Sequence, residues 1–306
     1  MSQPLVFPLP SAAVVNCRTS NGIPYRDWGG QGPPLHFAHA NGFPPGTYDA
    51  FMARLSAHFR CLGMECRATW GSADPAAFHH WREMGDDLAA FLREVGWSRV
   101  LAVGHSLGAV SSLYCAVSHP ELIGALVLID PVIVPPWAAP FWALSMATGL
   151  NRRSGLAVGA RRRRTEWPSR EVCLRAYRAA PVFRRWQEPF LRDYVWAATE
   201  ESAGGVRLRY PREWEARIFE TPPPDVWCVM RRLRNLPVLV IRGALSDTYR
   251  PEAIQAMRWL LPRMNLVEVA EADHFVPMAR PAEVCAALHD FAATLAPGTI
   301  GASTPI

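Results

Sequence analysis

The sequence predicts an α/β fold in which helices cover both faces of a mostly parallel sheet. Short apolar runs of strand length alternate with segments of helical spacing, a pattern typical of strands buried on both faces. Turn-forming glycine, asparagine and proline residues separate these runs. Between Asp130 and Leu236 the alternation stops, and a stretch rich in Trp and Arg predicts a largely helical insert. In such a sheet the insert would lie over the carboxyl ends of the strands, where ligands bind.

Each element of the core follows from its own pattern. Leu35 to Ala40 is apolar and short enough for a buried strand. Thr47 to Phe59 repeats apolar residues at helical spacing, and Phe59 to Glu65 can form the next strand. Trp81 to Val95 predicts an amphipathic helix that ends at Gly96. The later core elements are a helix at Ala109 to Ser118 and strands at Val100 to Val103, Ala125 to Ile129, Val238 to Ile241 and Leu266 to Val269.

Composition and charge narrow the classes of partner. A formal net charge of +5 on 306 residues is too small to indicate a nucleic-acid partner. The seven cysteines form no CxxC pair, which favours reduced thiols and a cytoplasmic location. Met1 to Pro10 lacks the basic segment of a signal peptide. Val132 to Leu150 is free of charge over 19 residues, but three prolines interrupt it, so we expect a buried or pocket-lining segment rather than a membrane span.

The motif Gly104-His105-Ser106-Leu107-Gly108 is the strongest indication of function. It matches the G-x-S-x-G turn between a strand and a helix, which projects a serine hydroxyl into a site. The predicted strand before the motif and the helix after it provide the required context. We therefore predict that Ser106 is a nucleophile, which needs an adjacent base.

The base should lie in a loop at the carboxyl end of another strand. Three histidines follow Ser106 in the chain. His274 lies in a loop directly after the predicted strand Leu266 to Val269, whereas His119 ends the helix after the nucleophile and His289 lies within the last helix. His274 is therefore the predicted general base.

A carboxylate should orient this histidine, and three candidates remain open. Asp247 is favoured because it follows the strand Val238 to Ile241 at the expected edge of the sheet. Asp130 ends the strand next to the nucleophile strand in chain order and is the alternative. Asp273 is a weaker third candidate, since the side chains of adjacent residues diverge.

Two backbone N–H groups should form an oxyanion hole. Leu107, the residue after the nucleophile, supplies the first. The second should come from the loop His39-Ala40-Asn41-Gly42-Phe43, which follows an earlier strand. Phe43 is the preferred donor, and Asn41 and Gly42 are alternatives.

These residues together resemble the α/β-hydrolase superfamily, in the branch with a lid inserted after the sixth strand. The resemblance covers roughly residues 14–131 and 233–296. It implies that the acid follows the seventh strand, at Asp247. It also implies a core made of residues 1–131 and 233–306 and a mainly helical cap formed by residues 132–232.

Two features depart from the family pattern. The usual His-Gly-aromatic loop is extended here by Ala40 and Asn41, which bears on the second oxyanion donor. The family's Asp-x-x-Gly-x-Gly after the fourth strand is replaced by Glu65 to Ser72.

The resemblance implies a serine hydrolase that forms an acyl-enzyme with a carboxylic ester, thioester or lactone and needs no cofactor or metal. Ser106 argues against relatives that use an aspartate nucleophile. Carbon–carbon bond hydrolysis or acyl transfer by the same triad is the alternative. A catalytically silent binding protein is a third interpretation.

Large apolar side chains at the start of the insert favour an apolar small-molecule substrate. His79-His80 lacks the spacing of a helical metal-binding pair. Arg161 to Arg164 is expected to be a solvated basic face, with binding of a phosphate-bearing carrier as the alternative. The residues expected to contact the substrate are Asn41, His105, Trp137, Phe141 and Trp142.

Overall fold

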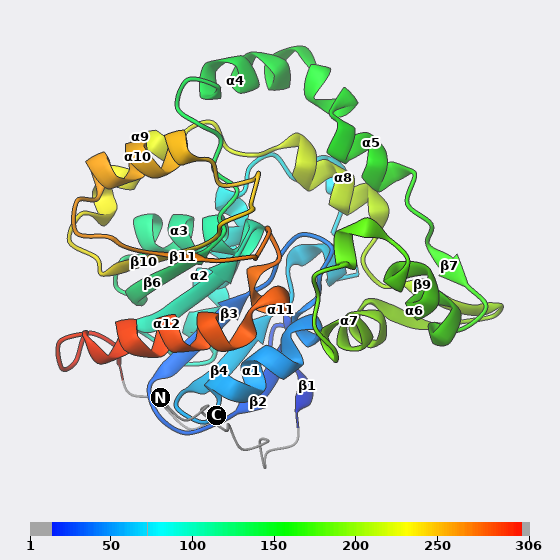
Figure 1. The fold of residues 1–306 in the computed structure, drawn as a ribbon, viewed down its shortest axis with the longest axis horizontal. Helices are drawn as coiled ribbons and strands as arrows, with labels where there is room; N and C mark the ends of the chain where they lie inside the picture. Colours follow the sequence, from blue (N-terminus) through cyan, green and yellow to red (C-terminus); the bar gives the residue numbers. More distant parts are fainter. Residues whose placement is uncertain (1–13, 72, 302–306) are drawn as a thin grey trace.

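The computed structural model describes residues 14–71 and 73–301 and contains the predicted α/β fold (Figure 1). The segment Met1 to Pro10, and Ser72 in the replaced fourth-strand motif, lie outside the described residues. The main sheet has the strand order β1-β2-β4-β3-β5-β6-β10-β11. Its strands are Val15–Arg18 (β1), Pro24–Gly29 (β2), Pro34–Ala38 (β3), Arg60–Met64 (β4), Val100–His105 (β5), Ile123–Ile129 (β6), Val238–Gly243 (β10) and Asn265–Val269 (β11).

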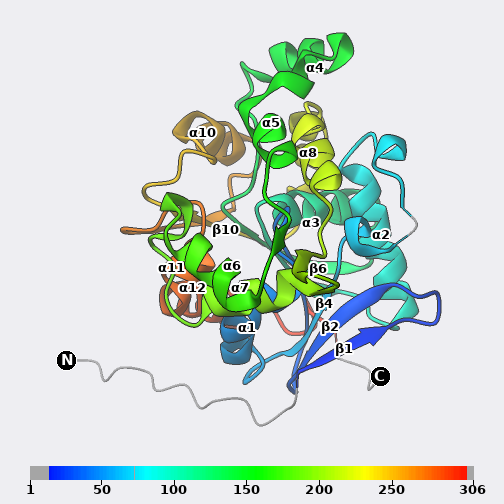
Figure 2. The same ribbon diagram turned by 90° about the vertical axis from the view of Figure 1, so that its right-hand side faces the viewer.

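Strands β4, β3, β5, β6, β10 and β11 are parallel, whereas β1 and β2 add an antiparallel edge. Helices cover both faces of the sheet (Figures 1 and 2). One face packs against α1 (Asp49–Leu55), α11 (Val276–Ala279) and α12 (Pro281–Ala293). The other packs against α2 (Arg82–Glu94), α3 (Leu107–Ser118), α9 (Val226–Met230) and α10 (Pro251–Leu260).

The central strand β5 shows why the apolar runs predicted buried strands. Val100 and Ala102 point into the core on the α2 and α3 side, and Leu101 and Val103 point into the core on the α1 and α12 side. Because side chains alternate along a strand, a strand buried on both faces must be apolar throughout. The carboxyl ends of β5, β6, β10 and β11 consequently meet at one edge.

The chain between β6 and β10 forms the insert. Its helices are α4 (Ala139–Thr148), α5 (Gly155–Arg161), α6 (Arg170–Arg178), α7 (Phe190–Ala198), α8 (Arg212–Glu220) and α9. It also contains a small antiparallel sheet of order β7-β9-β8, formed by Glu166–Trp167, Gly205–Leu208 and Thr199–Ser202. The sequence did not reveal this sheet, because its strands are short and largely polar. Single 3₁₀ turns lie at Pro45–Tyr48, Arg67–Thr69, Pro75–Ala77, Leu150–Arg153, Pro181–Phe183 and Arg231–Leu233.

The charge-free segment from Val132 to Leu150 differs from its expectation. Within α4 only Ala139 is buried, and Phe141 and Leu144 are 71% and 62% exposed. The prediction of a buried or pocket-lining segment is therefore wrong for this helix. Among the described residues no helix is both long enough and apolar enough to cross a membrane.

Candidate active site

Ser106 lies in the turn between β5 and α3, in a backbone conformation that a side chain rarely adopts, with φ 59° and ψ −116°. Two glycines permit this turn. A Cβ atom on Gly104 would lie 2.4 Å from the Gly108 carbonyl carbon, and one on Gly108 would lie 2.1 Å from the Ala38 carbonyl oxygen. Backbone strain of this kind is typical of functional sites. The turn holds the Ser106 hydroxyl at the carboxyl edge of the sheet.

Ser106, His274 and Asp130 form a hydrogen-bonded chain. His274 Nε2 lies 2.9 Å from Ser106 Oγ, and His274 Nδ1 lies 2.6 Å from Asp130 Oδ2. The Asp130 side chain is fully buried. It also accepts hydrogen bonds from the Ser246 hydroxyl at 2.6 Å and from the Gly243 N–H at 3.2 Å. These donors hold a buried carboxylate that would otherwise be costly to desolvate.

The favoured acid, Asp247, is not at the site. Its side chain is exposed, and its one recorded hydrogen bond in the described chain comes from the Thr248 hydroxyl at 3.4 Å. In the loop after β10, the preceding residue Ser246 points inward to Asp130, so Asp247 points to solvent. The choice of Asp247 is therefore wrong, and the alternative, Asp130, is the carboxylate that meets His274.

The third candidate, Asp273, also lies outside the chain of hydrogen bonds. It accepts from the Phe275 N–H at 3.0 Å and lies 3.6 Å from Arg185 Nε. Asp130 has a positive φ of 41° directly before Pro131, and it ends a strand that pairs with both β5 and β10. In the sequence, Asp130 stood out only as a carboxylate at the end of an apolar strand. A polar residue that merely ends a strand has the same pattern, so the sequence did not single Asp130 out as the partner of His274.

His105 supports the site from behind and is not exposed to a substrate. The Tyr48 hydroxyl lies 2.8 Å from His105 Nδ1, and His105 Nε2 lies 2.9 Å from the His274 carbonyl oxygen. Since a carbonyl can only accept, Nε2–H donates and Nδ1 accepts from Tyr48. Burial, reinforced by His274, lowers the pKa of His105 to about 3, so the ring stays neutral. The expectation that His105 binds substrate is therefore wrong.

The loop of residues 39–43, which we call the oxyanion loop, leaves two of its three predicted amides free. The Phe43 N–H donates to the Ala40 carbonyl at 3.1 Å. In the described chain the N–H groups of Asn41 and Gly42 have no recorded acceptor. Leu107 begins α3, where the N–H groups of the first turn have no partner within the helix. Phe43, the preferred donor, is thus occupied, and the alternatives Asn41 and Gly42 remain as candidates.

The side chain of Asn41 joins the core to the insert. Its amide donates to the Glu215 carbonyl at 3.0 Å and accepts from the Tyr210 hydroxyl at 2.9 Å. Tyr210 is also 3.3 Å from Cys66 Sγ. Because the side chain is buried and its polar atoms are bonded within the protein, the prediction that Asn41 binds substrate through its side chain is wrong.

The aromatic residues predicted to bind substrate lie near or on α4. Trp137 is 59% exposed and Phe141 is 71% exposed, whereas Trp142 is half-buried. No ring contact of these three side chains with an aromatic side chain of the site is recorded in the described chain. Their role in substrate binding therefore stays a prediction.

A different aromatic wall stands beside His274. The Phe275 ring centroid is 5.4 Å from that of His274, 5.1 Å from that of Phe43 and 5.2 Å from that of Trp186. Tyr194 packs on Phe43 at 4.9 Å. Trp186 and Tyr194 belong to the insert, and nothing in their local sequence distinguished them from its many other aromatic residues.

Arg163 departs from the expected solvated basic face. Its side chain is only 17% exposed. Its guanidinium donates to Glu215 at 2.8 Å, to the Tyr177 hydroxyl at 3.0 Å and to the Tyr194 hydroxyl. A Cβ atom on Gly42 would lie 3.4 Å from its Nη1. A cation paired with a carboxylate therefore lies directly behind the oxyanion loop.

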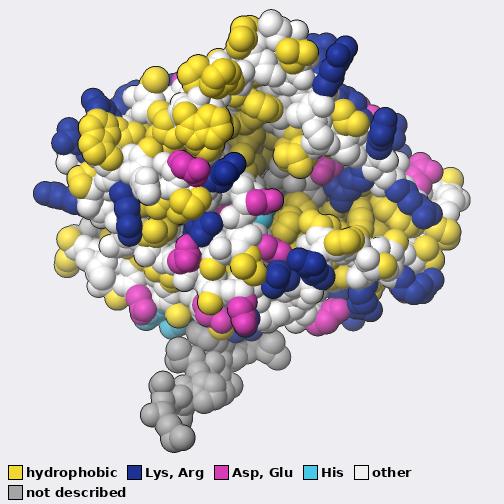
Figure 3. Space-filling view, turned by 45° about the horizontal axis from the view of Figure 1, so that its top comes forward, with side chains coloured by type: hydrophobic (Ala, Val, Ile, Leu, Met, Phe, Trp, Pro, Cys, Tyr) yellow, Lys and Arg dark blue, Asp and Glu magenta, His cyan; other side chains and the backbone are white. Residues whose placement is uncertain are grey.

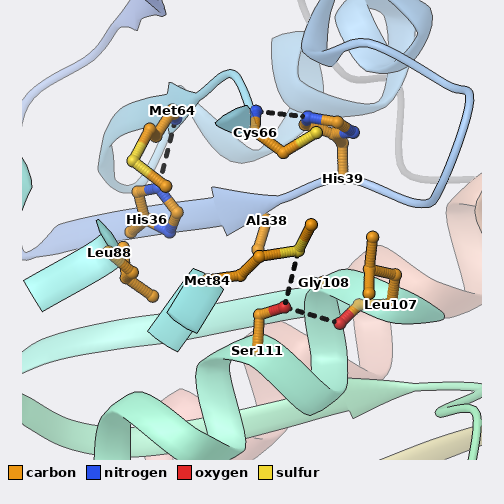
Figure 4. A pocket seen from close by; sticks show the side chains of 10 residues that line it. All are labelled: His36, Ala38, His39, Met64, Cys66, Met84, Leu88, Leu107, Gly108 and Ser111. Carbon is orange, nitrogen blue, oxygen red and sulfur yellow. Dashed lines mark hydrogen bonds between the residues drawn. The ribbon is translucent and has the colours of Figure 1, made fainter. Parts of the chain in front are cut away.

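An internal cavity of about 20 Å³ lies between α2, α3 and β3 (Figure 4). It has room for about one water molecule and is too small for a substrate. In the chain as described, no group of three or more His, Cys, Asp or Glu side chains is placed to hold a metal ion. The cavity is lined by His36, Ala38, His39, Met64, Cys66, Met84, Leu88, Leu107, Gly108 and Ser111.

Comparison with known proteins gives matches over most of the chain. The family model described as "Alpha/beta hydrolase family" matches residues 37–287. A 2-(acetamidomethylene)succinate hydrolase from Mesorhizobium japonicum is 25% identical over 262 residues, covering 86% of this chain and 88% of that protein. The esterase Rv0045c from Mycobacterium tuberculosis is 32% identical over 111 residues, which cover 34% of each chain.

Solved structures share the fold. The crystal structure of E-2-(acetamidomethylene)succinate hydrolase superimposes with a TM-score of 0.72 and 21% identity, covering 92% of this chain and all of the other. The crystal structure of esterase Rv0045c gives a TM-score of 0.71 with 21% identity, covering 94% of this chain and 92% of the other. At these identities the superpositions show the fold and leave the substrate open.

Proposed function

Because the chain belongs to the alpha/beta hydrolase family, we propose that it is a serine hydrolase in which Ser106 is the nucleophile, His274 the base and Asp130 the orienting acid. The continuous chain of hydrogen bonds between these three side chains carries the proposal. A hydroxyl, an imidazole and a buried carboxylate in this order are the arrangement that activates serine at neutral pH.

The proposed reaction proceeds through an acyl-enzyme. His274 Nε2 takes the Ser106 proton as Oγ attacks the carbonyl carbon, and Asp130 stabilises the resulting imidazolium through Nδ1–H. The N–H groups of Leu107 and Asn41 stabilise the oxyanion of the tetrahedral intermediate. The imidazolium then protonates the leaving group. Water, activated by the same histidine, releases the acid and restores Ser106.

The proposed substrate is an apolar carboxylic ester, thioester or lactone. Phe43, Phe275 and Trp186 are only partly buried and form an apolar wall beside His274. Residues 132–232 would act as the cap that contributes Trp186 to this wall. Since an apolar acyl chain gains free energy in proportion to the area it buries, activity should increase with chain length until the wall is covered.

Hydrolysis of an amide-type bond in a carboxylate-bearing substrate is the second candidate. The hydrolase that matches 86% of this chain is named for an acetamido-substituted succinate, and a partly buried cation, Arg163, lies close to the oxyanion loop. Glu215 neutralises this cation. An anionic substrate would have to displace Glu215 to use the cation, so the ester proposal is preferred.

The test is a substrate panel measured with the wild type and with Ser106→Ala. We expect hydrolysis of p-nitrophenyl esters to rise from acetate to longer acyl chains and to vanish in the variant. In Trp186→Ala the preference for longer chains should weaken, while hydrolysis of the acetate changes little. Activity confined to carboxylate-bearing amides, and lost in Arg163→Gln, would favour the second candidate. Ester hydrolysis that survives in Ser106→Ala would refute the site.

A further inference from the structure

An apolar surface without a partner forms one end of the insert. It consists of Trp137, Phe141, Leu144, Leu150 and Leu156, which are between 57% and 71% exposed. Phe141 and Leu144 are three residues apart on α4 and therefore share a face of the helix. We call these five residues the α4 surface. Scattered exposed apolar residues are normal on a protein surface, whereas a contiguous group marks an interaction site.

The α4 surface lies at an extremity of the molecule. α4 stands at the top of both ribbon views, far from the two ends of the described chain (Figures 1 and 2). Figure 3 shows hydrophobic side chains gathered over this end, with basic side chains beside them. The surface can therefore meet a flat, extended partner without a clash with the rest of the protein.

The chain segment that carries the α4 surface has charged residues of a single sign. Residues 131–165 contain six arginines and no acidic residue. Arg161 is paired with Glu220, and Arg163 is paired with Glu215. Arg152, Arg153 and Arg162 are exposed, and no ion pair of theirs is recorded among the described residues. An uncharged apolar helix followed by unpaired arginines is complementary to an apolar layer bordered by anions.

We propose that the α4 surface docks on anionic lipid bilayers, with the apolar side chains inserted at the headgroup boundary and Arg152, Arg153 and Arg162 bound to lipid phosphates. Apolar area and attraction to anionic lipids together determine the binding of interfacial helices. Each arginine near an anionic surface increases partitioning about fivefold. A second copy of the chain is disfavoured as the occupant, because a two-fold contact would bring the same unpaired arginines together. This inference does not depend on the proposed reaction.

The test is co-sedimentation of the full chain with vesicles of phosphatidylcholine alone or mixed with phosphatidylglycerol. We expect at least about tenfold stronger partitioning onto the anionic vesicles, weakened by added salt. The double variant Phe141→Asp with Leu144→Asp should lose about tenfold or more. The variant Arg152→Glu with Arg153→Glu should lose the preference for the anionic lipid. Trp259→Asp on α10, which removes an aromatic side chain that is 73% exposed, is the matched control and should bind like the wild type.

Three results would overturn the proposal. The first is no sedimentation with either vesicle, and the second is binding that does not distinguish the lipids. The third is a dimer in vesicle-free solution that Phe141→Asp dissociates, which would assign the surface to a second copy. Melting curves of each variant identify any loss of binding that comes from unfolding.

Discussion

The role of Asp130, which follows β6, can be tested against that of Asp247 in the loop after β10. In Asp130→Asn, His274 loses the carboxylate that fixes its tautomer and stabilises its imidazolium, so kcat should fall about 10²–10⁴-fold. In Asp247→Asn an exposed carboxylate becomes an amide, and kcat should stay within about twofold of the wild type. Ester hydrolysis at saturating substrate measures both. A large loss in Asp247→Asn with little change in Asp130→Asn would restore the original assignment.

These two aspartates also show what sequence reasoning could and could not reach at the scale of residues. Ser106 and His274 were predictable, because each follows an apolar strand in a loop whose composition indicates the function. Asp130 and Asp247 both follow apolar strands, so strand position alone could not separate them. The choice depends on which side chain of the loop after β10 points inward, and there Ser246 occupies the inward position. That orientation is a tertiary property.

At the scale of elements, the loop between β9 and α8 should control the oxyanion hole. Tyr210 in this loop bonds the side chain of Asn41, whose N–H is the proposed donor. Tyr210→Phe and Asn41→Ala should therefore lower kcat about tenfold or more with little change in KM, because the loss is confined to the transition state. Tyr25→Phe, which alters another buried tyrosine, is the control.

A boronic acid that mimics the tetrahedral intermediate separates this role from a general loss of packing. Its affinity should fall in Tyr210→Phe and Asn41→Ala by the same factor as kcat, since both depend on the oxyanion donor. Unchanged inhibitor affinity with a reduced melting temperature would mean that the bonds are merely structural.

The same elements show the limits of pattern reading. Strands of the main sheet such as β3, β5, β6 and β10 were predicted to within about two residues at each end, because burial on both faces requires a continuous apolar run. The strands of the small sheet in the insert pair through segments such as Thr199–Ser202, which carry no such run. The aromatic wall was missed for a related reason. Trp186 and Trp137 look alike in sequence, and only packing places Trp186 against Phe275.

For the whole molecule, two buried histidines predict how stability depends on pH. Burial lowers the pKa of both His36 and His105 from 6.5 to about 3. Below pH 6.5 the unfolded chain therefore binds protons that the folded chain does not. The free energy of unfolding should fall as pH decreases from 6.5 toward 3, by roughly 1.4 kcal/mol per pH unit for each histidine.

Urea denaturation between pH 7 and pH 5 measures this slope. His36→Gln should make it shallower, because glutamine can still accept the Met64 N–H bond now made by His36 Nε2 but does not titrate. His79→Gln alters an exposed histidine and should leave the slope unchanged. A stability that rises as the solution is acidified over this range would contradict the prediction.

The most direct test of the central claim is the site of labelling by a fluorophosphonate, which reacts with activated serines. The account predicts one phosphonyl group per chain, located by mass spectrometry on the peptide that contains Ser106. Labelling should be absent in Ser106→Ala and strongly slowed in His274→Ala and Asp130→Asn, while Asp247→Asn should react like the wild type. Labelling of another residue, or of Ser106→Ala at the wild-type rate, would contradict the claim that Ser106, His274 and Asp130 form the catalytic site.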